Sequence, residues 1–248
     1  MSSPAEPALG DRASDTSPAA RRRVLWELVS LWLFTLLAIR GVVMLQATTG
    51  MPEFVLAAVP CLFIYMPVFL CRLRKVDSYA YRLAIPAFRD RIAWGRALGT
   101  AGITLGIVLV PWLVGYHLYQ TLIFGFKPAM RMPAEPLTLI AYQLFFVAVP
   151  EEFFYRGYVQ TRLNEVFERR FLIFGVPCSH GLWIGCLLFA FGHSLVILRW
   201  WHFATFFPGL LFGLLREKTG GVMAGAFLHA AFNILVVWMD TVYGVIPP

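Results

Sequence analysis

Long apolar runs separated by short polar segments fill the chain after its first twenty or so residues. A bilayer core about 30 Å thick needs roughly 20 helical residues to cross it, because only a helix or a closed barrel satisfies its own backbone in lipid. The long unbroken apolar runs therefore indicate helices rather than the short alternating strands of a barrel. We therefore expect an all-α, polytopic membrane helix bundle of about seven transmembrane helices, with six or eight as alternatives. The expected spans are residues 24–45, 54–73, 97–119, 137–167, 178–198, 203–215 and 222–243.

The composition supports this interpretation and excludes a water-soluble globule. Of the 248 residues, 59% are hydrophobic and 14% are charged, and the mean hydropathy is +0.68. A net charge of +7 could suggest a nucleic-acid partner. However, the basic residues lie in short segments between apolar runs, where membrane topology accounts for them. We expect no nucleic-acid partner.

The distribution of basic residues predicts the orientation of the chain. With a cytoplasmic N-terminus, sixteen of the 21 basic residues fall in the inner segments and three in the outer ones. Residues 1–23 are rich in Ser, Ala and Pro, so we expect a disordered cytoplasmic tail. Residues 74–96 mix arginines with aromatic and aliphatic residues, which is typical of a segment lying on the inner leaflet.

The fourth predicted span contains two adjacent carboxylates and an arginine. Ionisable groups inside a bilayer are costly and are functional candidates by default. On a helix Glu152 and Arg156 share one face and can pair, whereas Glu151 points about 100° away and remains available as a general base. Pro150 cannot donate to the helical ladder and should open it beside the carboxylates. The alternative is a set of structural ion pairs that hold helices together.

The fifth and last predicted spans carry polar residues at one-turn spacing. His193 follows Phe189 by four residues, so Phe189 could form a wall of a site around this histidine. His229 and Asn233 share a face of the last span and can both donate hydrogen bonds, as an oxyanion requires. The alternatives are ordinary core packing for the first pair and an interhelical hydrogen-bond clamp for the second.

Taken together and in this order, the three motifs resemble those of a known family. Glu151-Glu152-x-x-x-Arg156, Phe189-x-x-x-His193 and His229-x-x-x-Asn233 are similar to the motifs of the CAAX-protease and bacteriocin-processing (CPBP, Abi) family of intramembrane endopeptidases. The resemblance covers residues 142–235. It implies that residues 137–248 form the catalytic transmembrane core, while residues 24–136 supply further transmembrane helices.

The resemblance implies peptide-bond hydrolysis and a role for each motif residue. Glu151 and His193 would activate a water molecule, and His229 and Asn233 would stabilise the oxyanion, while Glu152, Arg156 and Phe189 would support the geometry. The sequence has no HExxH motif, and a glutamate paired with an arginine is a poor ligand, so we expect no metal cofactor. Zinc is the alternative, with Glu151, His193 and His229 as its ligands.

The family includes prenyl-protein CAAX proteases, bacteriocin-processing and immunity proteins, and myxosortase-like proteases that remove C-terminal sorting tails. We expect a membrane-embedded or lipid-anchored protein substrate that is cut near a C-terminal tail, in a multi-pass protein of the bacterial inner membrane. A CAAX or bacteriocin-related role is the alternative within the family. A non-catalytic transporter or scaffold is the alternative from another class.

Overall fold

The protein is described from a computed structural model that covers residues 17–76, 85–86, 89–167 and 169–245. Most of the predicted tail at 1–23 and much of the predicted interfacial segment at 74–96 lie outside these residues. One expectation within the described part needs correction. Residues 18–23 already belong to a helix, because the Ser17 hydroxyl accepts from the Ala20 amide and Pro18 stands in the first turn. Residues 91–96 are helical and capped by Asp90, and the interfacial position of residues 74–96 stays a prediction.

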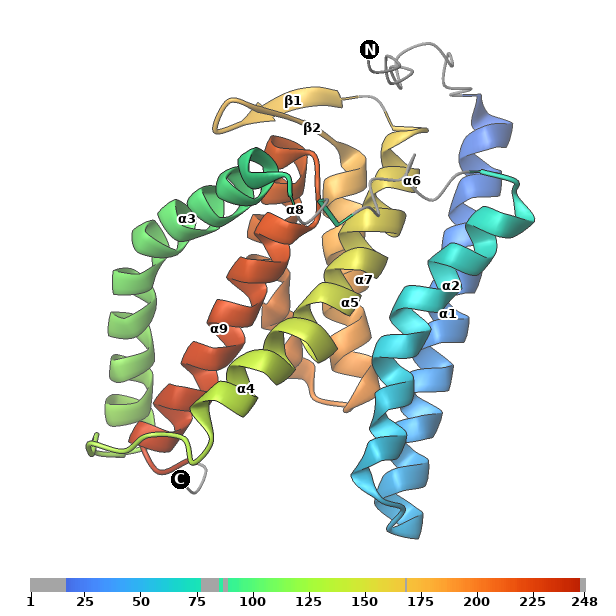
Figure 1. Ribbon diagram of the computed structural model, residues 1–248. Helices are drawn as coiled ribbons and strands as arrows, with labels where there is room; N and C mark the ends of the chain where they lie inside the picture. Colours follow the sequence, from blue (N-terminus) through green and yellow to red (C-terminus); the bar gives the residue numbers. More distant parts are fainter. Residues whose placement is uncertain (1–16, 77–84, 87–88, 168, 246–248) are drawn as a thin grey trace.

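The first two helices form an antiparallel pair at one side of the molecule (Figure 1). Helix α1 spans Pro18–Thr49. It is followed by a 3-10 turn at Glu53–Ala57 and by α2 at Ala58–Leu73. Between α1 and α2 the chain reverses at Gly50, whose φ of 65° is in the left-handed region that glycine adopts without strain. We call α1 and α2 together the N-terminal helix pair.

Helix α3, at Arg91–Leu118, stands at the opposite side of the molecule and ends in a π-helical segment at Tyr119–Ile123. It is bent in Figure 1, with its first part tilted and its last part steep. Pro111 lies inside this helix and removes one rung of its hydrogen-bond ladder.

The next helix is continuous from Pro136 to Asn164 and carries the two adjacent glutamates. It consists of α4 (Pro136–Tyr142), a π segment (Gln143–Ala148), α5 (Val149–Glu152), a second π segment (Phe153–Gln160) and α6 (Thr161–Asn164). The prediction that Pro150 disturbs the ladder is confirmed by π segments on both sides of it. The predicted end at residue 167 is wrong by three residues.

A β-hairpin follows, which the hydrophobic pattern did not predict. Strands β1 (Arg169–Ile173) and β2 (Val176–Ser179) pair antiparallel around a two-residue turn. Phe174 and Gly175 both have positive φ, at 50° and 76°, as a type I′ turn requires. The fifth span was predicted to begin at Cys178, but this residue lies in β2, and Ser179 caps the next helix by accepting from the Gly181 amide.

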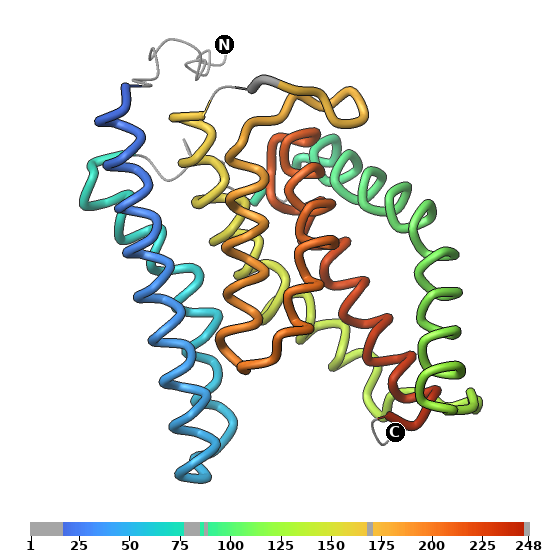
Figure 2. Tube along the Cα trace, turned by 180° about the vertical axis from the view of Figure 1, so that it is seen from behind, coloured from blue at the N-terminus to red at the C-terminus, as the bar shows by residue number. Residues whose placement is uncertain are grey.

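Three helices complete the bundle. They are α7 (His180–Val196), α8 (Phe206–Thr219, after a 3-10 segment at Trp200–Thr205) and α9 (Met223–Val242). Seen from behind in Figure 2, the connection between α7 and α8 lies well above the lower ends of α1 and α2, so these two helices do not extend as far as the N-terminal helix pair. The predicted start of the sixth span at residue 203 falls in the 3-10 segment.

The described chain therefore has seven helices where seven spans were expected, and the prediction of a polytopic helical membrane protein is confirmed. Five of the helices are long and apolar enough to cross a membrane, while α7 is a shorter apolar helix and α8 has 14 residues. The two ends of the bundle differ in charge. The start of α1, the end of α2, the start of α3, α6 and the end of α8 lie at one end of the bundle, and the end of α9 lies at the other (Figure 1). The elements at the first end carry Arg72, Arg91, Arg162 and Lys218.

Hydrogen bonds attach the N-terminal helix pair to the rest of the bundle. Glu27 on α1 accepts from the Tyr158 hydroxyl at 2.8 Å and forms an ion pair with Arg162 at 3.1 Å. Further along α1, the Trp32 indole donates to the Leu188 carbonyl at 3.0 Å, and Arg40 donates to the Leu195 carbonyl at 2.8 Å. Arg40, which the sequence placed inside a span, thus binds free carbonyls near the C-terminal end of α7.

Candidate active site

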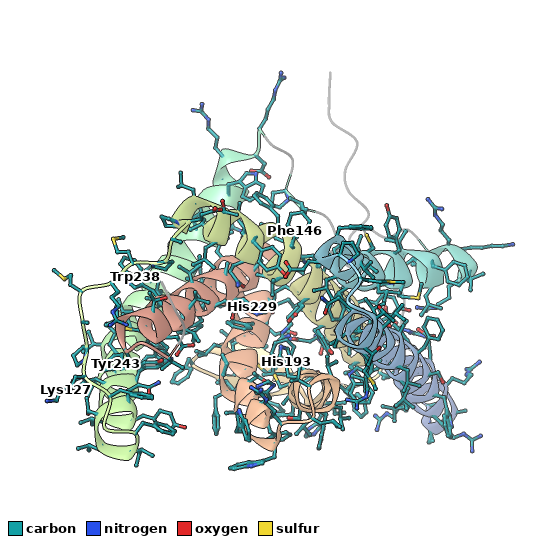
Figure 3. All side chains as sticks on the ribbon, turned by 90° about the horizontal axis from the view of Figure 1, so that it is seen from below. Lys127, Phe146, His193, His229, Trp238 and Tyr243 are labelled. Atoms are coloured by element: carbon teal, nitrogen blue, oxygen red, sulfur yellow. The ribbon has the colours of Figure 1, made fainter. Side chains whose placement is uncertain are left out.

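The three sequence motifs come together in the middle of the bundle. Glu151 and Glu152 lie on α5, His193 lies near the end of α7, and His229 lies in the second turn of α9. Viewed from below in Figure 3, His193 and His229 both lie near the centre of the helices, whereas Lys127 lies at the edge beside α3. Residues up to 78 positions apart thus form one polar cluster in an apolar bundle.

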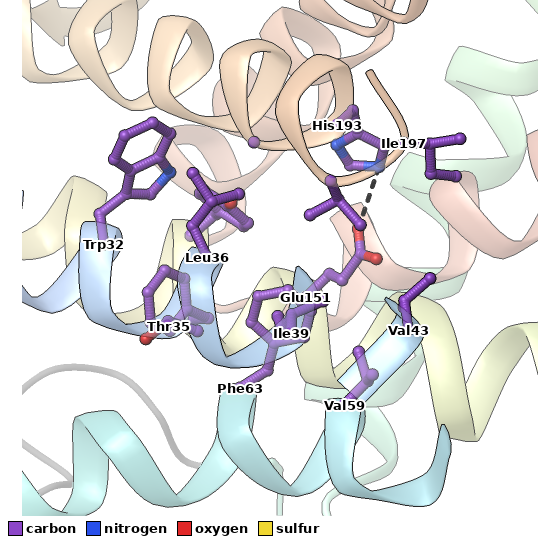
Figure 4. Close-up of a pocket in the computed structure, with 14 residues that line it drawn as sticks. Trp32, Thr35, Leu36, Ile39, Val43, Val59, Phe63, Glu151, His193 and Ile197 are labelled. Carbon is purple, nitrogen blue, oxygen red and sulfur yellow. Dashed lines mark ion pairs between the residues drawn. The ribbon is translucent and has the colours of Figure 1, made fainter. Parts of the chain in front are cut away.

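Glu151 faces both histidines. Its Oε2 atom is 3.6 Å from Nε2 of His193 and 3.9 Å from Nε2 of His229. Figure 4 shows the first of these contacts at the wall of a cavity. The Glu151 side chain is 15% exposed and that of His193 is 30% exposed. Glu151 therefore keeps an acceptor directed at two imidazoles and has no arginine partner among the described residues.

Glu152 is fully buried and has two partners. The predicted pair with Arg156 is present, with Nε of Arg156 3.4 Å from Oε2 of Glu152. The other carboxylate oxygen lies 3.2 Å from Nδ1 of His229. Arg156 also donates to the carbonyl of Gly209 at 2.7 Å, which connects the site to α8. A buried charge needs such partners, so this network holds three helices in one geometry.

Two phenylalanines surround these charges. The Arg156 guanidinium lies 4.3 Å from the centre of the Phe189 ring, at a distance typical of a cation–π contact. The same ring is 4.4 Å from the His193 ring, measured between centroids, so Phe189 does form a wall of the site. Phe212 on α8, which the motifs did not reveal, stacks on His229 at 4.8 Å with an interplanar angle of 14°. Nothing in the local pattern separated Phe212 from the many other apolar residues of its helix.

The hydrogen bonds indicate which nitrogen of each imidazole carries the proton. Nδ1 of His193 lies 3.0 Å from the carbonyl oxygen of Phe189, which can only accept. Nδ1 of His193 is therefore the donor, and Nε2 presents a lone pair toward Glu151 when the ring is neutral. Similarly, Nδ1 of His229 faces the Glu152 carboxylate, and its Nε2 faces Glu151. Both Nε2 atoms thus point into the space beside Glu151.

Asn233 lies one turn beyond His229 and bonds to a residue that the sequence analysis missed. Its amide nitrogen donates to Oε1 of Gln143 at 3.0 Å. Gln143 stands eight residues before Glu151 on the same long helix, a spacing of about two turns that could have marked it. An amide nitrogen carries two hydrogens, so one remains for another acceptor.

Two cavities meet at His193. The first, of about 200 Å³, lies between the N-terminal helix pair and helices α5 and α7, and we call it the N-terminal cavity. The second, of about 390 Å³, lies among α3, α7, α8 and α9, and we call it the C-terminal cavity. Glu151 lines the first cavity, while Phe189, His229 and Asn233 line the second. His193 lines both, so it forms part of the wall between them.

Within the described residues, no group of three or more His, Cys, Asp and Glu side chains has the arrangement of a metal site. The four cysteines are free, and three of them are buried. The arrangement contains a carboxylate that faces two imidazoles and, among the described residues, has no arginine partner, together with an amide donor, and apolar helices enclose it. These are the groups that a membrane hydrolase needs to polarise water and to stabilise a developing oxyanion.

An apolar helical bundle with this centre is the architecture of an intramembrane hydrolase. Residues 133–235 match the family model described as type II CAAX prenyl endopeptidase Rce1-like. The matched segment contains all three motifs. The chain therefore carries a domain of this family, which confirms the resemblance to the CPBP endopeptidases and identifies a CAAX-type intramembrane protease.

The match covers less than half of the chain and does not identify a myxosortase-like subtype. A search of curated proteins and a search of solved structures each found no match.

Proposed function

We propose that this protein is an intramembrane endopeptidase that hydrolyses a peptide bond near the membrane-anchored C-terminal tail of a protein substrate. The observation that carries the proposal is the position of Glu151, whose free carboxylate faces His193 at 3.6 Å in the wall of a cavity. Two acceptors at this distance do not bond directly, but one water molecule that lies to the side of both atoms, about 2.8 Å from each, can donate a hydrogen to each. Such a water has both protons held and a lone pair free for attack.

The reaction follows from this arrangement. The water oxygen attacks the carbonyl carbon of the scissile bond while Glu151 takes its proton, which is general base catalysis worth typically 10²- to 10⁴-fold. The tetrahedral intermediate carries its negative charge on the former carbonyl oxygen. When the intermediate collapses, the C–N bond breaks and the protonated Glu151 returns its proton to the leaving nitrogen. One water is consumed, and a carboxyl and an amino terminus are formed.

His229 and Asn233 are the proposed donors to the oxyanion. Both line the C-terminal cavity, and each has a hydrogen-bonding position that the Glu152 and Gln143 contacts leave unoccupied. For His229 to donate from Nε2 while Nδ1 donates to Glu152, the ring must be an imidazolium. An oxyanion donor of this kind is worth about 3 to 4 kcal/mol in the transition state.

We further propose that catalysis needs no metal ion. Glu152 is committed to Arg156 and His229, which makes it a poor ligand. Activity of the purified protein should then survive dialysis against a strong chelator. Loss of activity on chelation, with recovery on adding zinc, would instead assign Glu151, His193 and His229 as zinc ligands.

The substrate is proposed from the position of the site. A site enclosed by apolar helices can be reached by chains that are themselves in or anchored to the bilayer. The N-terminus is proposed to be cytoplasmic and the membrane to be the bacterial inner membrane, on the basis of the excess of basic residues at one end of the bundle. The description of the matched family favours a second candidate, a prenylated C-terminal segment.

The test is the substitution Glu151→Gln, which keeps size and hydrogen-bonding capacity but removes the base. We expect cleavage to fall at least about 100-fold with unchanged insertion and thermal stability. Glu53→Gln, at an exposed glutamate in the 3-10 turn between α1 and α2, is the matched control and should retain full activity. Wild-type activity in Glu151→Gln would refute the mechanism.

Terminus-resolved proteomics of membranes from wild-type and Glu151→Gln cells would identify the substrate class. Accumulation of proteins with uncut hydrophobic C-terminal tails would support the first candidate. Accumulation of uncut prenylated termini would support the second. If no terminus differed and the uptake or export of a solute did, a transport function would replace the protease.

A further inference from the structure

Gln143 is a polar residue of the long helix to which the mechanism above assigns no role. Its Oε1 atom accepts a hydrogen bond from the side-chain amide of Asn233 at 3.0 Å, across 90 positions of the chain. Both residues are half-buried, and both lie in helices long and apolar enough to cross a membrane. A bond between two neutral amides in such surroundings either holds the helices together or orients one amide for another task.

The backbone at Gln143 departs from a regular α-helix. Gln143 is the first residue of the π segment Gln143–Ala148, which lies between α4 and α5. A π turn contains an extra residue, so it changes the direction of the side chains before it relative to those after it. Such segments are frequent at functional sites. The direction of the Gln143 side chain relative to Glu151 is therefore one that a regular helix would not give.

Small residues bring this π segment close to α9. Ala148 packs with Ala226 and Ala230 of α9, and all three are almost completely buried. Alanine allows two helix backbones to approach closely. Asn233 follows Ala230 by three residues and lies on the same face of α9. The close contact of the alanines therefore holds Asn233 within reach of Gln143.

The two amides differ in what they can contact. Asn233 lines the C-terminal cavity together with His229, one turn earlier on α9. Gln143 lines neither of the two cavities that meet at His193. An effect of Gln143 on a substrate in the C-terminal cavity therefore has to pass through Asn233.

The bond to Gln143 determines which end of the Asn233 amide can act on an oxyanion. The terminal bond of an asparagine side chain has a broad, roughly two-fold preference, so its oxygen and nitrogen can exchange places. An oxyanion needs the nitrogen, because the amide oxygen would repel the developing charge. Oε1 of Gln143 holds one hydrogen of this nitrogen. The second hydrogen then remains in a defined direction for the oxyanion.

We infer that Gln143 is a positioning residue, which accepts from Asn233 and so keeps the amide nitrogen of Asn233 directed at the oxyanion. The inference rests on the proposed endopeptidase function and assigns a role to a residue outside the three motifs. Gln143 takes no part in proton transfer and does not touch the scissile bond. Its contribution is made where negative charge develops, so it acts on the transition state rather than on substrate binding.

Gln143→Leu is the test, because leucine suits the apolar bundle and offers no acceptor. The full-length protein in vesicles would be given peptides with a hydrophobic C-terminal anchor and, separately, peptides anchored by S-farnesyl cysteine. We expect kcat to fall about 10-fold with KM within about 2-fold of wild type. Gln143→Glu keeps an acceptor oxygen whether or not it is protonated, and it should restore kcat to within about 3-fold.

A double-mutant cycle tests whether Gln143 acts through Asn233. Asn233→Ala removes the donor itself and should lower kcat at least about 100-fold. Adding Gln143→Leu to Asn233→Ala should change kcat by no more than about 2-fold, because no amide remains to be oriented. A further fall of about 10-fold in the double variant would show that Gln143 acts independently of Asn233 and would overturn the inference.

Thermal unfolding separates positioning from an interhelical clamp. A clamp is lost equally in Gln143→Leu and in Asn233→Ala, so equal falls in kcat with equal falls in melting temperature would overturn the inference. We expect unequal falls in kcat, and a melting temperature of Gln143→Leu within about 3 °C of wild type. Gln46→Leu makes the same change on α1, outside the lining of both cavities, and should alter neither quantity.

The inference and the proposed function fail in different ways. Wild-type kcat in Gln143→Leu, with Glu151→Gln inactive, would overturn the positioning role and leave the protease mechanism in place. Activity in Glu151→Gln would instead refute the underlying function.

Discussion

Arg156 shows how a single buried charge can determine the geometry of this site. Its side chain is 2% exposed, and its guanidinium contacts Glu152, the Gly209 carbonyl and the face of Phe189. Glu152 in turn holds Nδ1 of His229. The orientation of His229 therefore depends on Arg156, a residue that has no part in the proposed proton transfer.

Removal of either Arg156 or Glu152 should affect folding as well as activity. Arg156→Ala leaves Glu152 buried without its guanidinium partner, and Glu152→Gln does the same to Arg156. For each we expect the free energy of unfolding to fall by about 3 to 5 kcal/mol, together with a loss of cleavage. Thermal unfolding in detergent and a cleavage assay would measure the two effects. Arg22→Ala, at an exposed arginine of α1, should change neither. Unchanged stability in Arg156→Ala would contradict this account of the network.

Close approach of helices is the main feature at the scale of the elements. A Cβ atom added at Gly225 on α9 would lie 2.9 Å from Oε2 of Glu152 and 3.5 Å from the carbonyl of Phe212. One added at Gly209 on α8 would lie 3.1 Å from the Arg156 guanidinium. Helices in membranes commonly use small residues to approach one another in this way. These glycines let α8 and α9 close around the glutamates.

Gly225→Ala should therefore impair catalysis without changing any charged residue. The added methyl group displaces the Glu152 carboxylate from Arg156 and His229, and we expect cleavage to fall by about 10-fold or more. Gly99→Ala on α3 is the matched control, because a Cβ at Gly99 meets nothing within 4 Å. It should be neutral or slightly stabilising, since alanine favours a helix over glycine. Equal activity of the two variants would show that the approach at Gly225 is not required.

The whole molecule has a pronounced asymmetry between its ends. The start of α1, the ends of α2 and α6, and the β-hairpin lie at one end, and the segment between α3 and α4 lies at the other with the end of α9 (Figure 1). Basic residues are concentrated at the first end. Retention of positive segments on the cytoplasmic side predicts that this end faces the cytoplasm.

Single cysteines in a cysteine-free background would test this orientation. Met130, fully exposed between α3 and α4, and Arg89, exposed before α3, lie at opposite ends of α3. In intact cells an impermeant thiol reagent should label Met130→Cys and should label Arg89→Cys only after the cells are broken. The reverse pattern would invert the topology and remove the basis for a cytoplasmic N-terminus.

The sequence was sufficient for the helices and for the pairing of Glu152 with Arg156, because hydrophobic runs and one-turn spacings are local properties. It was not sufficient for the β-hairpin, because the strands are only five and four residues long and the turn is defined by the positive φ angles of Phe174 and Gly175. The predicted helix boundaries also differ from the observed ones by several residues, because the observed boundaries depend on capping residues such as Ser179 and Asp90.

The amino-acid sequence by itself determined that this is a helical membrane protein and which motif residues are candidates for its active site, because the energetic cost of polar groups in lipid makes them conspicuous in an apolar sequence. Only the tertiary structure decided that Glu151 faces two imidazoles, that Asn233 bonds to Gln143, and that His193 separates two cavities. These relations join residues far apart in the chain. They arise from how closely the helices pack, and the periodicity of residues within one helix does not determine the distance between two helices.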